Sequence, residues 1–203
     1  VAQYPDGTYG LNLFGYNPVA YARESGDQQD TFNQGALTGR LNIELLPGWF
    51  TLRTMAAIRY DDNQWDRFQT DSRFIPTWPA TGAPWGPNSL ENRNIQVRQV
   101  TFQAMLDYQH AFANGVHSIS GVLGYEQIAN DYEEFRAWRS QFYNNELRRL
   151  NLGNADTDGN WGAGNEWRLR SAFGRLSYAF RDRYLLEANA RYDGSSRFAE
   201  GRR

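Results

Sequence analysis

The chain has 203 residues, a formal net charge of −2 and no cysteine. These values exclude a disulfide scaffold and thiolate chemistry, and they give no basic field that would attract nucleic acid. The sequence contains no run of 18 apolar residues, so it predicts no transmembrane helix. This criterion does not detect membrane-spanning strands, because their apolar and polar residues alternate.

The first regular stretch, residues 37–60, alternates apolar and polar side chains on either side of Pro47-Gly48. A Pro-Gly pair suits the two central positions of a tight turn. Pairing across it sets Leu45 opposite Phe50, and the apolar faces of the two flanking segments then coincide. The pattern therefore predicts a β-hairpin.

A long connection is expected over residues 63–96. It is rich in proline and carries Trp78 and Trp85. Exposed indole faces could stack on sugar rings or other flat ligands, which makes both residues candidates for substrate contact. The alternative is a rigid loop whose tryptophans pack on the loop itself or on a neighbour.

A second hairpin is predicted around Asn114-Gly115, a strong signal for a two-residue type I′ turn. That turn pairs Ala113 with Val116 and again brings the apolar faces together. The chain's two histidines, His110 and His117, then fall on the apolar parity near the turn. We expect them to lie at a membrane interface and not in a catalytic or metal site.

The next long connection is expected over residues 129–165. Phe135, Trp138 and Phe142 follow the spacing i, i+3, i+7, which predicts a short amphipathic helix that ends near Gly153. The simplest role for such a helix is packing on the rim of the protein or on a partner. Trp138 and Trp161 complete the set of loop tryptophans considered for substrate binding.

Asn154, Asp156, Asp158 and Gly159 resemble the first half of a calcium-binding loop. The twelfth position is Asn165, however, where such a loop needs a bidentate glutamate. We therefore favour a plain turn and expect no metal and no cofactor, with Asp156 and Asp158 as a weak calcium candidate.

A third hairpin is predicted over residues 168–194. The three-residue turn Arg181-Asp182-Arg183 pairs Phe180 with Tyr184. Continuing this register sets Ala172 opposite Tyr192, with apolar side chains on one face and polar ones on the other.

Six strands of roughly 11–15 residues follow, joined alternately by short turns and long connections. This predicts an all-β, antiparallel, up-and-down transmembrane barrel fragment as one domain, residues 1–203, with the short turns periplasmic, two long loops extracellular and one possible short loop helix. Aromatic residues at both strand ends would form interfacial girdles, the outer one from Tyr60, Tyr125, Trp167 and Tyr192. The alternative is a soluble β-rich glycan-binding module, which would bury Leu41, Leu106, Leu123, Leu176 and Leu186 in one core.

In a barrel the polar parity faces the lumen, where charges line a transport path, contact a plug or neutralise one another. Established catalytic motifs are missing from the sequence, so we do not expect an enzyme. The lumen-facing candidates are Arg40, Arg53, Arg59, Gln103, Asp107, Glu126, Arg175, Glu187 and Arg191.

The last 33 residues, "SAFGRLSYAFRDRYLLEANARYDGSSRFAEGRR", resemble a stretch of the SusC/RagA-type TonB-dependent transporters. A weaker resemblance covers "NPVAYAR" at residues 17–23. The matching positions of the long motif are Ser171, Phe173, Gly174, Arg175, Leu176, Tyr178, Asp182, Tyr184, Leu185, Leu186, Arg191, Asp193, Gly194, Ser195, Ser196, Arg197 and Phe198.

The resemblance implies a 22-stranded barrel in the outer membrane of a Gram-negative cell, with an N-terminal plug that this chain lacks. Such proteins import large nutrients, oligosaccharides or peptides, with energy from TonB. A SusD-like surface lipoprotein, TonB and outer-membrane lipids are the partners that the resemblance implies for the complete protein.

Overall fold

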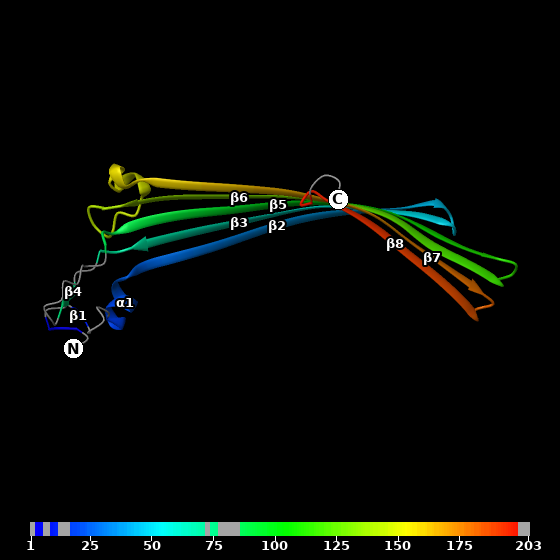
Figure 1. Cartoon of the computed structure of the whole chain (residues 1–203), viewed down its shortest axis with the longest axis horizontal. Helices are drawn as coiled ribbons and strands as arrows, with labels where there is room; N and C mark the ends of the chain where they lie inside the picture. Colours follow the sequence, from blue (N-terminus) through cyan, green and yellow to red (C-terminus); the bar gives the residue numbers. More distant parts are fainter. Residues whose placement is uncertain (1–2, 6–8, 12–16, 72–73, 77–85, 199–203) are drawn as a thin grey trace. The chain divides into compact units, whose positions relative to one another are not determined.

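The structure, a computed structural model, describes residues 3–5, 9–11, 17–71, 74–76 and 86–198. Its main feature is a six-stranded sheet with the strand order β2-β3-β5-β6-β7-β8 (Figure 1). The strands are β2 (Gly26–Leu46), β3 (Phe50–Gln69), β5 (Ser89–Phe112), β6 (His117–Ser140), β7 (Gly159–Phe180) and β8 (Tyr184–Ser195). The predicted all-β, antiparallel, up-and-down fold is confirmed.

The chain divides into two compact units. Residues 33–61, 96–133 and 164–203 form what we call the hairpin unit, which contains the three tight turns. Residues 1–32, 62–95 and 134–163 form the loop unit, which contains the long connections. Within the described ranges, no helix is long and apolar enough to cross a membrane.

The three tight turns of the hairpin unit lie where the sequence predicts them. Trp49 N donates to Leu46 O at 2.9 Å, and Gly48 has φ 76°. At the second turn, Asn114 and Gly115 both have positive φ, 55° and 85°, as a type I′ turn requires. Backbone geometry therefore reproduces the local turn signals.

The register of the third hairpin also agrees with the prediction. Phe180 pairs with Tyr184, and Ala172 pairs with Tyr192 at the far end of the same ladder. In the first hairpin, the Gln34 side chain donates to Asp61 at 2.8 Å, and the predicted register sets these two residues directly opposite each other. Turn position together with alternation of side chains was therefore sufficient to predict the pairing in the first and third hairpins.

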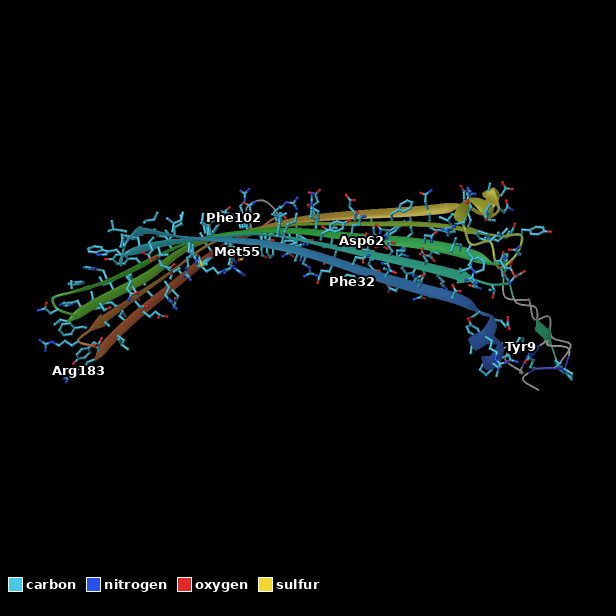
Figure 2. All side chains as sticks on the ribbon, turned by 180° about the vertical axis from the view of Figure 1, so that it is seen from behind. Tyr9, Phe32, Met55, Asp62, Phe102 and Arg183 are labelled. Carbon is cyan, nitrogen blue, oxygen red and sulfur yellow. The ribbon has the colours of Figure 1, made fainter. Side chains whose placement is uncertain are left out.

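Each strand of the hairpin unit has an apolar face and a polar face, and side chains project from both sides of the strands (Figure 2). The apolar face is exposed: Leu41 is 57 % exposed, Leu123 66 % and Leu186 69 %. Leu176 is exposed too, and Leu106 is half-buried. A soluble module would bury these five leucines in one core, so the structure contradicts that alternative.

Aromatic rings form a row beside the tight turns on the apolar face. The Trp49 ring contacts His110 in a tilted arrangement with centroids 3.8 Å apart, and Phe112 stacks on His117 at 4.8 Å. The row continues from His117 to Phe180 at 5.1 Å and then to Tyr184. The predicted girdle at the turns is thus a continuous set of contacts that includes both histidines.

Apart from β8, the strands of the six-stranded sheet are longer than predicted, because they include residues of the loop unit. The connection after β3 begins at residue 70 and not at 63, and the connection after β6 begins at 141 and not at 129. Side chains join these added strand segments: Asn94 donates to Asp62 at 2.9 Å, and Arg93 donates to Glu134 at 2.7 Å. Polar cross-strand pairs stabilise strands that lack an apolar alternation.

The predicted helix over residues 135–153 is wrong. Phe135 and Trp138 belong to β6 and therefore lie on opposite faces of a strand, while Phe142 is buried beyond its end. Pairing of β6 with β5 and β7 overrides the helical spacing. Two 3-10 turns, Leu150–Leu152 and Ala155–Thr157, are the helical elements found in this connection.

A small core closes the loop unit. Phe68, Leu90 and Phe142 are buried together, with Leu150 packed against them. Asn88, 2 % exposed, accepts a hydrogen bond from Phe142 N at 2.7 Å and donates to Phe142 O at 3.2 Å. One buried amide therefore anchors the connection after β6 to the start of β5.

The N-terminal part of the loop unit contains α1 (Pro18–Glu24), which the sequence did not predict. Asn17 caps it by accepting from Val19 N and Ala20 N, and Pro18 occupies its first turn. The "NPVAYAR" segment is therefore a capped helix immediately before β2. Two short strands, β1 (Tyr9–Leu11) and β4 (Phe74–Pro76), pair in parallel.

Candidate functional site

The polar face of the hairpin unit carries a hydrogen-bonded charge network centred on Arg191. Its guanidinium donates to Asp193 at 2.8 Å and to Ser171 at 3.0 Å, and it lies 3.6 Å from Glu126. Glu126 also accepts from Gln103. Ser171 is 1 % exposed, whereas the Arg191 side chain is half exposed. Arg191 is therefore held by a buried partner and still presents part of its guanidinium to solvent.

The Phe173 ring packs against Arg191 of this network. Its centroid lies 5.6 Å from the Arg191 guanidinium. The ring packs over Gly124 so closely that a Cβ there would come within 2.2 Å of it. Glycine at position 124 is thus required by the ring of the neighbouring strand.

The remaining lumen candidates form smaller pairs. Arg53 binds Asp107 through two bonds of 2.5 Å, and Arg59 binds Asp61 at 2.6 Å. Glu187 accepts from Ser177 at 3.1 Å and from Asn189 at 3.0 Å. Arg40 and Arg175 make no hydrogen bond or ion pair with the described residues. Arg175 lines a groove of about 620 Å³ with Arg53, Phe173, Asn189 and Arg191.

The motif residues that follow β8 are hydrogen-bonded to the backbone of β7. Ser196 N donates to Arg168 O at 2.9 Å, and Arg168 N donates to Ser196 Oγ at 2.9 Å. The Arg197 guanidinium lies 4.8 Å from the Trp167 ring. Trp167 shares the parity of Ser171, so the structure does not place it in the outer girdle with Tyr60, Tyr125 and Tyr192. The prediction was wrong because Trp167 was assigned to the girdle by its position near the strand end, without regard to its parity.

Other motif residues serve the third hairpin. The Tyr178 hydroxyl lies 2.6 Å from His117 Nδ1, and Tyr184 stacks beside Phe180. Asp182 adopts φ 55° in the turn, a conformation that aspartate tolerates better than most residues. Gly194 and Ser195 end β8, Ser195 O accepts from Phe198 N at 3.3 Å, and Phe198 is exposed.

A charge cluster that the sequence analysis missed lies on the apolar parity, beyond Tyr125. Asp131 binds Arg98 at 2.7 Å and Arg168 at 2.6 Å. Hydrogen bonds from Arg98 and Arg168 hold the pKa of the Asp131 carboxyl below its usual range. The break from apolar to charged residues along β5 and β6 was the signal that could have identified it.

The loop unit brings together two of the four candidate tryptophans. Trp138 and Trp161 line a groove of about 500 Å³ with Glu91 and Arg136. The Arg136 guanidinium lies 5.1 Å from the Trp161 ring, and Glu134, which is buried, fixes Arg136 at 2.7 Å. Both indoles are exposed, at 40 % and 46 %.

The other candidates have different outcomes. Trp78 and Trp85 lie outside the described residues. Asn154 does not act as an open ligand, because its side chain accepts from Asp156 N at 3.0 Å and caps a 3-10 turn. Asp158 lies 3.7 Å from Arg139. Among the residues that the structure describes, no group of three His, Cys, Asp or Glu side chains could hold a metal ion.

The chain is similar in sequence to TonB-dependent receptors. No family model matches the chain. It is 31 % identical over 202 residues to TonB-dependent receptor P3 of Formosa agariphila, covering 96 % of this chain and 19 % of that protein. TonB-dependent receptor P39 of the same organism is 26 % identical over 212 residues, covering 97 % and 18 %. The chain thus spans about a fifth of the curated relatives it matches.

Solved structures share the fold. A RagAB peptide transporter structure matches 89 % of this chain and 19 % of its own chain, with a TM-score of 0.76 and 19 % identity. A RagAB peptide importer in the closed-closed state matches 91 % of this chain with the same score. The comparisons confirm the resemblance stated from the sequence: over almost its whole length the chain is similar to a stretch of TonB-dependent receptors, and it shares the fold of the RagAB transporter.

Proposed function

We propose that this chain is part of an outer-membrane active transporter that imports large nutrients with energy supplied through TonB. The observation that carries this proposal is the exposed apolar face of the hairpin unit combined with sequence similarity to TonB-dependent receptors over 96 % of the chain. A SusD-like surface lipoprotein is the proposed partner on the outside of the cell.

The apolar face has the extent that a bilayer requires. It runs from the aromatic row at the turns to Tyr60, Tyr125 and Tyr192, through strand segments of residues 50–60, 117–125 and 184–192. A tilted strand needs ~9–11 residues to cross the hydrocarbon core. Tyrosines at one end and a mixed aromatic row at the other match the two interfaces of a membrane.

The polar face supports a role as the wall of a water-filled lumen. Its charges are paired by hydrogen bonds, as at Arg191–Asp193 and Arg53–Asp107, and the pairs remain partly exposed. Arg40 and Arg175 are the side chains that we assign to contact with a plug or a passing substrate, and Arg175 is also attracted to the Glu187 carboxylate. Such a wall positions charge without the cost of burying it.

The groove of Trp138 and Trp161 is the proposed substrate contact. Indole faces stack on the apolar faces of sugars and on peptide side chains, while Glu91 and Arg136 supply polar contacts at the rim. The substrate class is therefore an oligosaccharide or a peptide, and the related RagAB structures are named as peptide transporters. Trp78 and Trp85 remain candidates for the same role.

The test uses the whole receptor that contains this segment. Trp138→Ala and Trp161→Ala are expected to weaken binding of the imported substrate about tenfold each, since truncating a contact aromatic costs more than ~1 kcal/mol. The readouts are calorimetric binding to oligosaccharide and peptide libraries and growth on the best ligand. Tyr143→Ala is the matched control, because Tyr143 is 95 % exposed and does not line the groove.

Two outcomes would contradict the proposal. If both tryptophan variants bind and grow as the parent does, the groove is not the substrate contact. If the receptor is absent from the outer membrane, or growth does not depend on TonB, the transporter assignment itself fails.

A further inference from the structure

A groove of about 570 Å³ lies in the apolar face of the hairpin unit, and of the residues in the Arg191 network only Ser171 is among those that line it. Tyr125 and Tyr192 line it together with the small residues Ala172 and Gly194. Ala172 pairs with Tyr192 across the β7–β8 ladder, so a small side chain separates the two tyrosines. The result is a slot with aromatic walls at the end of the apolar face that lies away from the turns.

Two arginines, Arg168 and Arg170, complete the lining, and they differ in how they are bound. Arg168 is held by Asp131 at 2.6 Å and Glu166 at 3.3 Å. Arg170 is exposed and makes no hydrogen bond or ion pair with any residue that the structure describes. The slot therefore presents one guanidinium whose charge is not compensated locally.

We propose that this slot binds the phosphate headgroup of a glycolipid in the outer leaflet of the membrane. The placement in a membrane rests on the proposed function. Arg170 would bind the phosphate through its planar pair of N–H donors, a geometry suited to phosphate oxygens. The Ser195 and Ser196 hydroxyls at the same end of the slot supply further polar contacts.

The surroundings of the slot favour a lipid over a soluble anion. Exposed apolar residues continue from it toward the turns, including Leu123, Leu176 and Leu186. Acyl chains can cover this surface while the headgroup stays at the level of the tyrosines. A free phosphate would contact the arginine but would bury none of the apolar surface. The arginine and the apolar surface beside it therefore favour an amphipathic anion.

The test is native mass spectrometry of the purified whole receptor, titrated with lipid A in detergent. Arg170→Gln is expected to lower the apparent affinity for lipid A at least tenfold, and Arg170→Lys less. Ala172→Leu fills the slot without changing charge and should have a similar effect, and its exposed position lets the barrel fold. Arg149→Gln, which removes the same charge from an exposed connection residue, is the control and should bind as the parent does.

Each outcome decides the inference. Equal retention of lipid A by the parent, Arg170→Gln and Ala172→Leu receptors overturns it. Binding of inorganic phosphate with no retention of lipid A also overturns it, as does phosphatidylglycerol retained as tightly as lipid A. Outer-membrane location and growth on substrate are measured on the same variants, so loss of lipid dependence alone leaves the transporter proposal standing.

Discussion

Gly124 shows how one residue position supports the charge network of the polar face. A Cβ at this position would meet the Phe173 ring at 2.2 Å, and that ring lies beneath Arg191. Gly124→Ala should displace the ring and destabilise the folded receptor by about 1–3 kcal/mol, the usual cost of overpacking. The temperature at which the band on unheated SDS gels loses its folded mobility measures this.

Gly35→Ala is the matched control, because a Cβ at Gly35 meets nothing within 4 Å. It should leave that temperature unchanged. Equal effects of the two substitutions would show that the contact between Phe173 and Gly124 is not a source of stability.

The Asp131 carboxyl makes a pH dependence testable at a second residue. Hydrogen bonds from Arg98 and Arg168 lower its pKa in the folded protein. The stabilisation from this pair is therefore fully present above the ordinary Asp value of ~3.9 and is lost as pH falls through the lower, folded value. Asp131→Asn should remove this part of the acid sensitivity.

The measurement is thermal unfolding of the whole receptor in detergent between neutral pH and about pH 3. The difference in midpoint between the parent and Asp131→Asn should shrink as the pH drops. Asp156→Asn serves as control, since the exposed Asp156 carboxylate has no ion pair among the described residues. A difference that stays constant with pH would argue against the ion pair.

At the scale of elements, the backbone conformation of the tight turns contributes to hairpin formation. Gly115 has φ 85°, and a Cβ there meets nothing within 4 Å. The cost of Gly115→Val is thus the backbone conformation alone, about 1–2 kcal/mol. We expect slower folding of the receptor into lipid vesicles, while Gly35→Val, at a position without positive φ, should fold at the parent rate. Identical folding rates for the two variants would contradict a type I′ turn as a determinant of hairpin formation.

The sequence predicted the hairpin unit well because turn residues and alternation of apolar residues agree there. Beyond Asp62 and before Gln96 the strands become polar on both faces, so period two disappears from the sequence. These segments pair through side-chain bonds such as Asn94–Asp62, which join residues far apart in the chain. For the same reason, Trp138 was assigned to a helix: local spacing favoured one, and pairing with β7 decided otherwise.

At the scale of the whole molecule, the motif identified the family more clearly than it identified a site. Arg191, Asp193 and Ser171 were recognisable in sequence, and the predicted register sets Ser171 opposite Asp193. Which of these polar side chains bond to one another did not follow from the register, and the structure shows Arg191 bonded to Ser171 and to Asp193. The groove of Trp138 and Trp161 draws on three strands, and no spacing in one sequence predicts that convergence. Apolar pairs near a tight turn were predictable, and polar pairs far from the turns, such as Arg98–Asp131 within the β5–β6 hairpin, were not.

The topology of the receptor in the membrane gives a prediction for the complete protein. The connection after β6 should face the outside of the cell and the turn between β7 and β8 the periplasm, because barrels place long connections outside and short turns inside. Tyr143 is 95 % exposed in the first, and Arg183 is exposed in the second (Figure 2).

In a cysteine-free background, Tyr143→Cys should react on intact cells with a maleimide coupled to a polymer too large for porins. Arg183→Cys should react after the outer membrane is opened and not before. The reverse pattern would invert the topology, and labelling of both positions on intact cells would refute placement of the apolar face in the outer membrane.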